Sequence, residues 1–143
     1  MQNYKNHVRY YVPHHFVFYP VILLLAAIAV MQVLKNDTNA LLWIFVAAIV
    51  LLVGWLSFML RQHYALTLQN RIVVLEMRLR YYVLTQQRLE QLEDRLSFGQ
   101  IAALRFASDE ELPALVQRTL AEKLSPVEIK QSIKQWLPDY KRV

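Results

Sequence analysis

Residues 40–60 read ALLWIFVAAIVLLVGWLSFML, an apolar run that contains no charged side chain. About 20 apolar residues, at a helical rise of 1.5 Å each, match the ~30 Å hydrocarbon core of a bilayer. Trp43 and Trp55 lie near the two ends of the run, which suits the aromatic belts found at membrane surfaces. The run therefore predicts a membrane-spanning helix, and the rest of the chain is interpreted relative to it.

A second apolar run precedes the first. Residues 16–34 read FVFYPVILLLAAIAVMQVL, again without a charge, and the polar residues 35–39 between the runs include turn-forming Asn and Asp. Because a short polar link joins antiparallel neighbours, we expect the spans 16–34 and 40–60 to form a hairpin. A cleaved signal peptide is the alternative for the first run, but its apolar stretch continues beyond the small residues 27–29.

The distribution of charge predicts the orientation of this hairpin. Residues 1–15 carry two basic and no acidic side chains, and residues 61–88 have a net charge of +4. Positive charge favours the cytoplasmic side of a membrane, so both termini are expected in the cytoplasm. The distal residues 89–143 have a net charge of −1. Because the positive excess lies beside the spans, we expect it to face anionic lipid head groups rather than nucleic acid.

Basic, imidazole and aromatic side chains gather at the predicted cytoplasmic ends of the spans. Residues 1–15 predict an interfacial segment, because amphipathic rings lie comfortably at head-group depth. We name six residues of this region the collar and predict that they contact lipid: Lys5, Arg9, His14, His15, Arg61 and His63. Since His titrates near neutral pH, the collar also allows a response to pH.

Beyond the second span, the composition predicts one long helix, a cytoplasmic stalk. Residues 61–96 contain neither Pro nor Gly and are rich in strong helix formers. Apolar residues recur at a spacing near 3.5, which indicates a coiled-coil or helix-packing contact. The predicted contact residues are Ile72, Leu75, Leu79, Tyr82, Leu89 and Leu96. Further apolar residues at 73–74, 77, 81 and 83–84 widen this surface, so more than one partner helix is expected along it.

The remaining tail contains start signals for short helices. Ser97 with Gln100 and Ser108 with Glu111 have the spacing of a capping box, although Pro113 delays the second helix by a residue or two. Residues 125–128 (SPVE) combine an N-cap Ser, Pro at the first helical position and Glu at the third, and the helix that they begin is expected to end at Pro138. The apolar residues of the tail suffice for a small core, packed on the stalk of the same chain or of a neighbouring copy.

These patterns together predict an all-α membrane protein. Its organisation is an interfacial N-terminal segment (1–15), a transmembrane hairpin (16–60), and a cytoplasmic part (61–143) made of the stalk helix and short C-terminal helices.

Three segments carry a resemblance to a known family. They are QNYKNHVRYYVPHH at 2–15, RLSFGQIAALRFASDEEL at 95–112 and SPVEIKQSIKQWLPDYKRV at 125–143. In these segments the chain resembles an uncharacterised family of small two-span bacterial membrane proteins, a domain of unknown function, over essentially its whole length. The resemblance implies a two-helix anchor in the bacterial inner membrane with a helical cytoplasmic tail. It implies no activity, substrate or catalytic residue.

No catalytic, cofactor-binding or metal-binding residue is expected. The two glycines do not form a phosphate-binding loop, the absence of Cys removes thiol chemistry, and no acidic residue occurs among the first 36 residues, where three of the four His lie. The acidic pairs and triplets of the tail are better explained as solvated helix faces and partners of helix N-termini. We therefore expect a protein that is not an enzyme.

Three functions remain compatible with the sequence. The first is a self-assembling, homo-oligomeric scaffold or accessory subunit, whose stalk binds another copy or a different membrane protein. The second is a pore-forming homo-oligomer, in which Gln32 and Ser57 are the candidate polar lining of the spans. The third is a membrane regulator that responds to lipid or pH through the collar.

Overall fold

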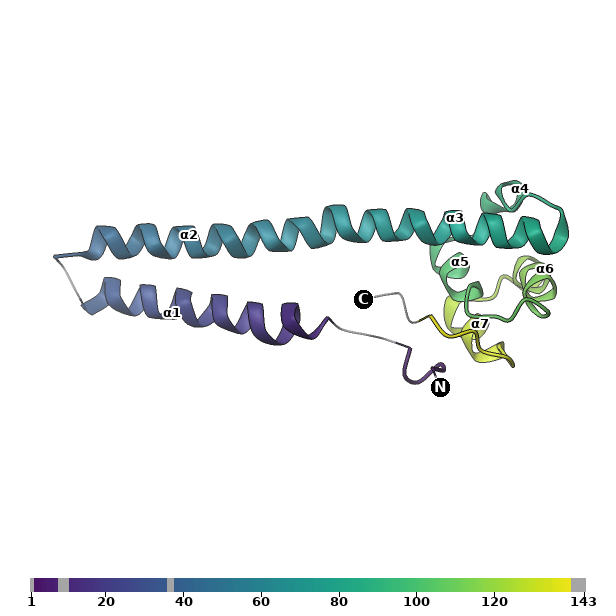
Figure 1. Ribbon diagram of the computed structural model, residues 1–143, viewed down its shortest axis with the longest axis horizontal. Helices are drawn as coiled ribbons and strands as arrows, with labels where there is room; N and C mark the ends of the chain where they lie inside the picture. Colours follow the sequence, from purple (N-terminus) through teal and green to yellow (C-terminus); the bar gives the residue numbers. More distant parts are fainter. Residues whose placement is uncertain (1, 8–10, 36–37, 140–143) are drawn as a thin grey trace. The chain divides into compact units, whose positions relative to one another are not determined.

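The computed structural model describes residues 2–7, 11–35 and 38–139 of the 143-residue chain, and the elements of this part are helices (Figure 1). The described residues fall into two compact units. The hairpin unit contains residues 11–35 and 38–67, and the C-terminal unit contains residues 2–7 and 68–139. Each unit is described by itself below.

The hairpin unit contains two antiparallel helices that lie side by side (Figure 1). Its elements are η1 (Pro13–Phe18), α1 (Tyr19–Lys35), α2 (Ala40–Met59) and η2 (Leu60–Ala65), where η marks a π-helical turn. The two helices approach closely at Gly54 of α2, because a Cβ atom there would lie 3.2 Å from Cγ2 of Ile22 in α1. A larger residue at position 54 would require Ile22 to shift by a few tenths of an ångström, so glycine suits this close contact, as at many helix crossings in membranes.

Apolar side chains cover most of the surface of this hairpin. Two helical stretches, Pro13–Lys35 and Ala40–Thr85, are long and apolar enough to cross a membrane, and 6% and 0% of their most apolar windows are buried. A core helix of a globular domain would be mostly buried by its own chain. The predicted pair of apolar helices is confirmed, and both are candidate membrane spans.

The helical backbone continues from Ala40 through η2 and α3 (Leu66–Thr85). The predicted extent of this helix, to residue 96, is wrong. It ends at Thr85, whose hydroxyl donates to the carbonyl of Tyr81 at 2.7 Å and accepts from the amide of Gln87 at 3.1 Å. Gln86 then adopts a left-handed conformation with φ of 57°.

This termination needs neither Gly nor Pro because burial further along the chain compensates for it. Leu89 and Leu96, both predicted on the surface of the stalk, are buried in the core of the C-terminal unit. Burying a leucine side chain stabilises a protein by about 1.5–3 kcal/mol, whereas a non-glycine residue in the left-handed region costs about 1–2 kcal/mol. Two buried leucines therefore outweigh one strained glutamine.

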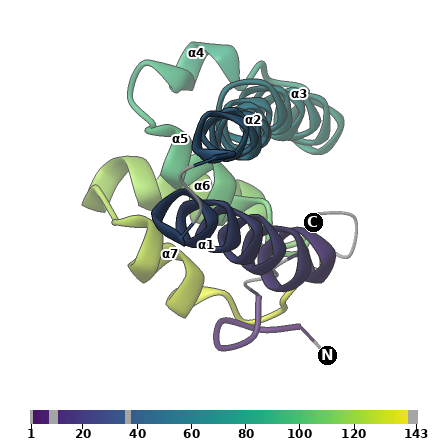
Figure 2. The same ribbon diagram turned by 90° about the vertical axis from the view of Figure 1, so that its left-hand side faces the viewer.

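Four short helices follow α3 in the C-terminal unit. They are α4 (Glu90–Glu93), α5 (Phe98–Leu104), α6 (Leu112–Glu122) and α7 (Pro126–Ser132). Figure 2 shows α5, α6 and α7 gathered on one side of α3. The core lies between them and α3, and its largest fully buried members are Tyr81, Met77, Leu89, Leu104, Leu112, Ile129 and Val116. The tail thus packs on the long helix of its own chain, one of the two arrangements that the sequence left open.

Two of the three predicted capping boxes are present. Ser97 and Ser125 each accept a hydrogen bond from the amide three residues later, and Gln100 and Glu128 complete the reciprocal bonds. The capping box of Ser108 is not formed, because α6 begins at Leu112 with Pro in its first turn. The carboxylate of Glu111 instead accepts hydrogen bonds from two backbone amides, those of residues 134 and 135, at 3.2 and 3.1 Å.

The last helix is shorter than predicted, since α7 ends at Ser132 rather than at Pro138. Ile133 is extended, and Trp136 forms an isolated antiparallel bridge with Ala107. The indole of Trp136 stacks on the ring of Phe106, with 4.7 Å between the ring centroids. This aromatic contact requires an extended chain and therefore competes with continuation of the helix.

The predicted interfacial segment, residues 1–15, is divided between the two units. Residues 2–7 pack on the C-terminal unit: Gln2 accepts a hydrogen bond from the amide of Asp139 at 2.6 Å, and His7 lies against the rings of Phe106 and Trp136. Nε2 of His7 is 3.0 Å from Nζ of Lys130. Residues 11–15 belong to the hairpin unit.

Candidate interaction surface

One face of α3 is covered by the chain's own helices. Val73, Met77 and Tyr81 follow one another at a spacing of four residues and are only 6%, 2% and 1% exposed. Residues four apart lie one above the other on a helix, so these three form a continuous stripe. Met77 and Tyr81 of this stripe belong to the core of the C-terminal unit and hold α3 in it.

The other face of α3 is apolar and exposed. Its residues are separated alternately by four and three positions, which is the heptad pattern of a coiled coil. We call this face the α3 seam and define it by Leu68, Ile72, Leu75, Leu79 and Tyr82. All five are exposed, from 47% at Tyr82 to 66% at Leu79.

The structure thus separates the six residues predicted as one contact surface. Ile72, Leu75, Leu79 and Tyr82 belong to the α3 seam, whereas Leu89 and Leu96 belong to the core of the C-terminal unit. Leu68 was missed by the sequence reasoning. Extension of the heptad pattern by one step toward the N-terminus identifies it.

Two oppositely charged residues flank the α3 seam. Arg71 precedes the seam residue Ile72, and Glu76 follows Leu75. Both are exposed, and neither takes part in the ion pairs that join described residues within the unit. Their charges are therefore available to a partner placed on the seam.

The other arginines of α3 bind within the chain. Nε of Arg78 donates to Glu93 at 2.6 Å, which joins α3 to α4 and raises the pKa of Arg78 above its usual value. Arg80 donates to the carboxylate of Asp109 at 2.6 Å and to the carbonyls of residues 105 and 107 at 3.0 and 2.6 Å. These bonds fasten the loop before α6 to the edge of the buried face.

The collar residues are only partly brought together. His14, His15 and Arg61 belong to the hairpin unit, in which the two imidazole rings meet edge to face at 5.4 Å. His63 lies edge-on to Tyr64 in the same unit. Lys5 is exposed on the C-terminal unit, and Arg9 lies outside the described residues.

The candidate pore-lining residues lie far apart along the hairpin. Gln32 is half-buried in α1 near the link between the helices, and Ser57 is half-buried near the opposite end of α2. The helices are antiparallel, so these side chains do not form one polar layer within a single hairpin.

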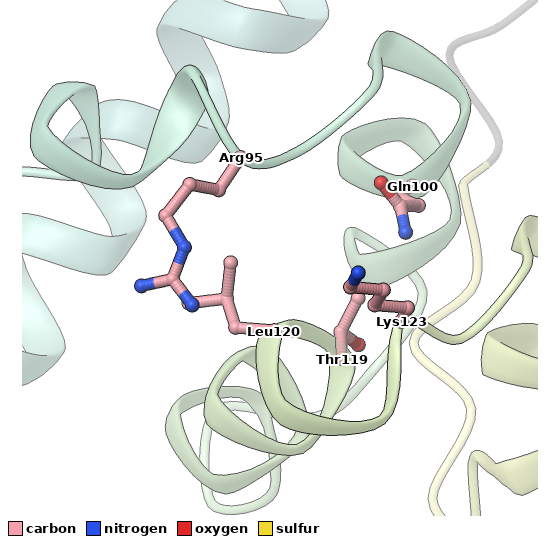
Figure 3. A pocket seen from close by; sticks show the side chains of 5 residues that line it. All are labelled: Arg95, Gln100, Thr119, Leu120 and Lys123. Carbon is pink, nitrogen blue, oxygen red and sulfur yellow. The ribbon is translucent and has the colours of Figure 1, made fainter.

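A hollow of about 410 Å³ opens on the C-terminal unit. Figure 3 shows Arg95 reaching over Leu120 from one side, and Lys123 standing beside Gln100 and Thr119 on the other. The uncharged polar groups already have internal partners, because Gln100 donates to the carbonyl of residue 124 at 2.7 Å and Thr119 to that of residue 115 at 2.7 Å. Only the two exposed cations face solvent, and we assign no ligand to this hollow.

Clusters of three or more potential metal ligands are not found within residues 2–7, 11–35 and 38–139. The most distinctive feature of the described chain is therefore the α3 seam, with its flanking Arg71 and Glu76.

The fold defines an all-helical protein with two candidate membrane spans. The chain matches, over residues 1–143, a family described as a family of unknown function (DUF6526), and it belongs to this family. The resemblance inferred from its segments is thereby confirmed at the level of the family. Neither a curated protein nor a solved structure matches the chain.

Proposed function

We propose that this protein is an integral membrane protein that self-assembles through α3, and that it serves as a homo-oligomeric scaffold or accessory subunit. The observation that carries this proposal is the α3 seam, an apolar heptad stripe that the chain's own helices leave uncovered. The proposal has two parts, anchoring by the hairpin and assembly by α3.

The surface of the hairpin supports anchoring in a bilayer. Its helices expose large apolar side chains on most sides, such as Leu23, Leu52 and Trp55. Water would oppose exposure of such a surface at about 25 cal/mol per Å², whereas lipid chains do not. The basic residues at 1–15 and 61–88 favour insertion with both termini in the cytoplasm, and we place the protein in the bacterial inner membrane.

The energetics of the α3 seam support assembly. Full burial of a Leu, Ile or similar side chain contributes about 1.5–3 kcal/mol, and five such residues face solvent on each copy. Association of two free proteins costs several kcal/mol in lost motion. Confinement to one membrane reduces that cost. The free energy gained by burying the two seams is therefore expected to exceed the cost of association.

The sharpest test compares the mass of the full chain in nanodiscs, by native mass spectrometry, with that of the variant carrying Leu75→Glu and Leu79→Glu. The proposal expects a defined oligomer for the wild type and a monomer for the variant, because burial of unpaired carboxylates in an apolar seam is strongly unfavourable.

The matched control is Val127→Glu, which places the same charge at an exposed apolar position in α7. This variant should retain the oligomer. Hydrogen exchange of α5 and α6 should be unchanged in both variants, which shows that the C-terminal unit still folds. A monomeric wild type would overturn the assembly proposal.

The paired rings of His14 and His15, with Arg61 in the same unit, favour a second candidate function, binding of anionic lipid with a response to pH. The test is binding of the protein in detergent to anionic lipid, with Arg61→Gln as the variant and Arg118→Gln, at an exposed position in α6, as the control. Loss of binding in the first variant alone supports lipid recognition, and equal binding in both removes this candidate.

A further inference from the structure

We propose that the partner of the α3 seam is the α3 seam of a second copy, in a parallel and in-register pair in which Arg71 of each copy meets Glu76 of the other. This inference rests on the proposed function, because it specifies the geometry of the same assembly. The arguments come from the heptad positions, the flanking charges and the covered face of α3.

The heptad positions favour a two-stranded pair. Ile72 and Leu79 occupy the first apolar position of their heptads, and Leu68, Leu75 and Tyr82 occupy the second. A β-branched residue at the first position with Leu at the second favours two parallel strands, and the central residues Ile72 and Leu75 match this rule. Tyr82 ends the stripe, where its hydroxyl can reach solvent.

The flanking charges favour the parallel direction. Arg71 immediately precedes a first apolar position, and Glu76 immediately follows a second one. In a parallel coiled coil, a residue just before a first apolar position (heptad position g) meets the residue five positions later in the partner (position e). For Arg71 of one copy, that residue is Glu76 of the other. In an antiparallel pair, residues that precede a first apolar position face one another, and residues that follow a second one face one another, so Arg71 does not meet Glu76.

The internal bond of Arg78 fixes the register. A shift of the two helices by one heptad would bring Arg78, rather than Arg71, to Glu76 of the partner. Arg78 is already bonded to Glu93 of its own chain at 2.6 Å. Arg71 is exposed and is not bonded in this way. The in-register pair therefore forms two ion pairs without breaking one that exists.

The covered face of α3 limits the number of partners. Met77 and Tyr81 are buried by the chain's own helices, so only the opposite side of α3 is open to another molecule. One seam accommodates one partner helix. Both copies also enter α3 from the same side of the membrane if they share one topology, which again favours a parallel pair.

The first experiment reverses the two charges in the full-length chain. Arg71→Glu and Glu76→Arg are each expected to weaken dimerisation about 5- to 30-fold, measured by energy transfer between labelled copies in vesicles over a range of protein-to-lipid ratios. The chain that carries both changes should recover the wild-type value, because each ion pair is restored with its charges exchanged. Loss without recovery would overturn the pairing of Arg71 with Glu76.

The second experiment uses the absence of Cys from the chain. Leu68→Cys and Tyr82→Cys place one thiol at either end of the α3 seam. In a parallel, in-register pair each variant forms a disulfide-linked dimer with its own copy, whereas an antiparallel pair links only a mixture of the two variants. Val127→Cys, on the exposed side of α7, is the control that should not cross-link.

The outcomes separate the two proposals. A defined oligomer that is cross-linked at both ends of the seam and sensitive to single charge reversal supports the parallel pair. A defined oligomer that cross-links only in the mixture, or not at all, overturns the parallel pair and leaves self-assembly standing. A monomeric wild type overturns both.

Discussion

The two faces of α3 have similar chemistry and opposite environments. Val73, Met77 and Tyr81 are buried, and the last two belong to the core that α3 shares with α5–α7. Ile72, Leu75 and Leu79 of the same helix are more than half exposed. Both stripes repeat at helical spacing, so both appear in the sequence as one broad apolar surface. The comparison teaches that the number of partners of a helix follows from which stripe its own chain covers. Here one stripe stabilises the fold, and the other remains exposed.

The largest effect is expected on the buried face. Met77→Ala should lower the free energy of unfolding of the C-terminal unit by about 2–5 kcal/mol, because it leaves a cavity among closely packed side chains. Hydrogen exchange of the α6 amides in the full-length protein measures this loss. Leu79→Ala, on the α3 seam, should leave that protection within about 0.5 kcal/mol of wild type. Equal losses would show that the two faces do not differ as described.

A smaller effect is expected at the edge of the buried face. Arg80→Ala removes hydrogen bonds to Asp109 and to two backbone carbonyls, and its side chain is only 19% exposed. The expected loss in stability is about 1.5–3 kcal/mol, as for hydrogen bonds to charged groups. Arg71→Ala is the matched control, since Arg71 is exposed and takes part in none of the ion pairs that join described residues of the unit. Exchange protection in the loop before α6 should fall only in the first variant.

Substitutions at the N-caps of α5 and α7 test how much these two helices contribute to the stability of the C-terminal unit. Ser125→Ala removes the hydroxyl that accepts from the amide of Glu128 at 3.3 Å and should cost about 1 kcal/mol. Ser97→Ala should cost a similar amount at the start of α5. Thermal unfolding monitored by circular dichroism measures both changes. An unchanged oligomer mass in each variant is the expected control.

The smallest expected effect concerns the loss of stability at acidic pH. A hydrogen bond from Ser125 holds the pKa of Glu128 below its ordinary value. A lowered pKa in the folded state stabilises the fold above the ordinary carboxyl pKa near 4.5, and this contribution disappears as the pH falls through the lowered value. In the Glu128→Gln variant, the melting temperature should therefore fall less between about pH 6 and pH 3 than it does in the wild type. Glu90 and Glu110, whose pKa values are also lowered, contribute the decrease that both proteins share.

Local signals predicted the elements more reliably than their ends. The two apolar runs, the link between them and the capping boxes at Ser97 and Ser125 were readable because each depends on residues close in the chain. The ends of α3 and α7 could not be predicted from the sequence. Each ends where a residue distant in sequence offers a better contact, the core for Leu89 and Phe106 for Trp136.

The candidate site shows the same division. Periodicity identified four of the five residues of the α3 seam, but it placed Leu89 and Leu96 with them, because a straight helix through residue 96 was assumed. Residues 2–7 were grouped with the membrane interface by composition, although the bond from the amide of Asp139 to Gln2 could be found only in the folded chain.

The sequence by itself determined the helical class, the two candidate spans, the charge asymmetry and an apolar stripe that one helix cannot bury alone. These properties depend on composition and on spacing within a few turns of helix. Only the tertiary structure decided which half of the stripe the chain covers, because that choice depends on where α3 ends and on how α5–α7 return to it. The exposed half of α3, and with it the proposed pairing of two copies, follows from that long-range packing.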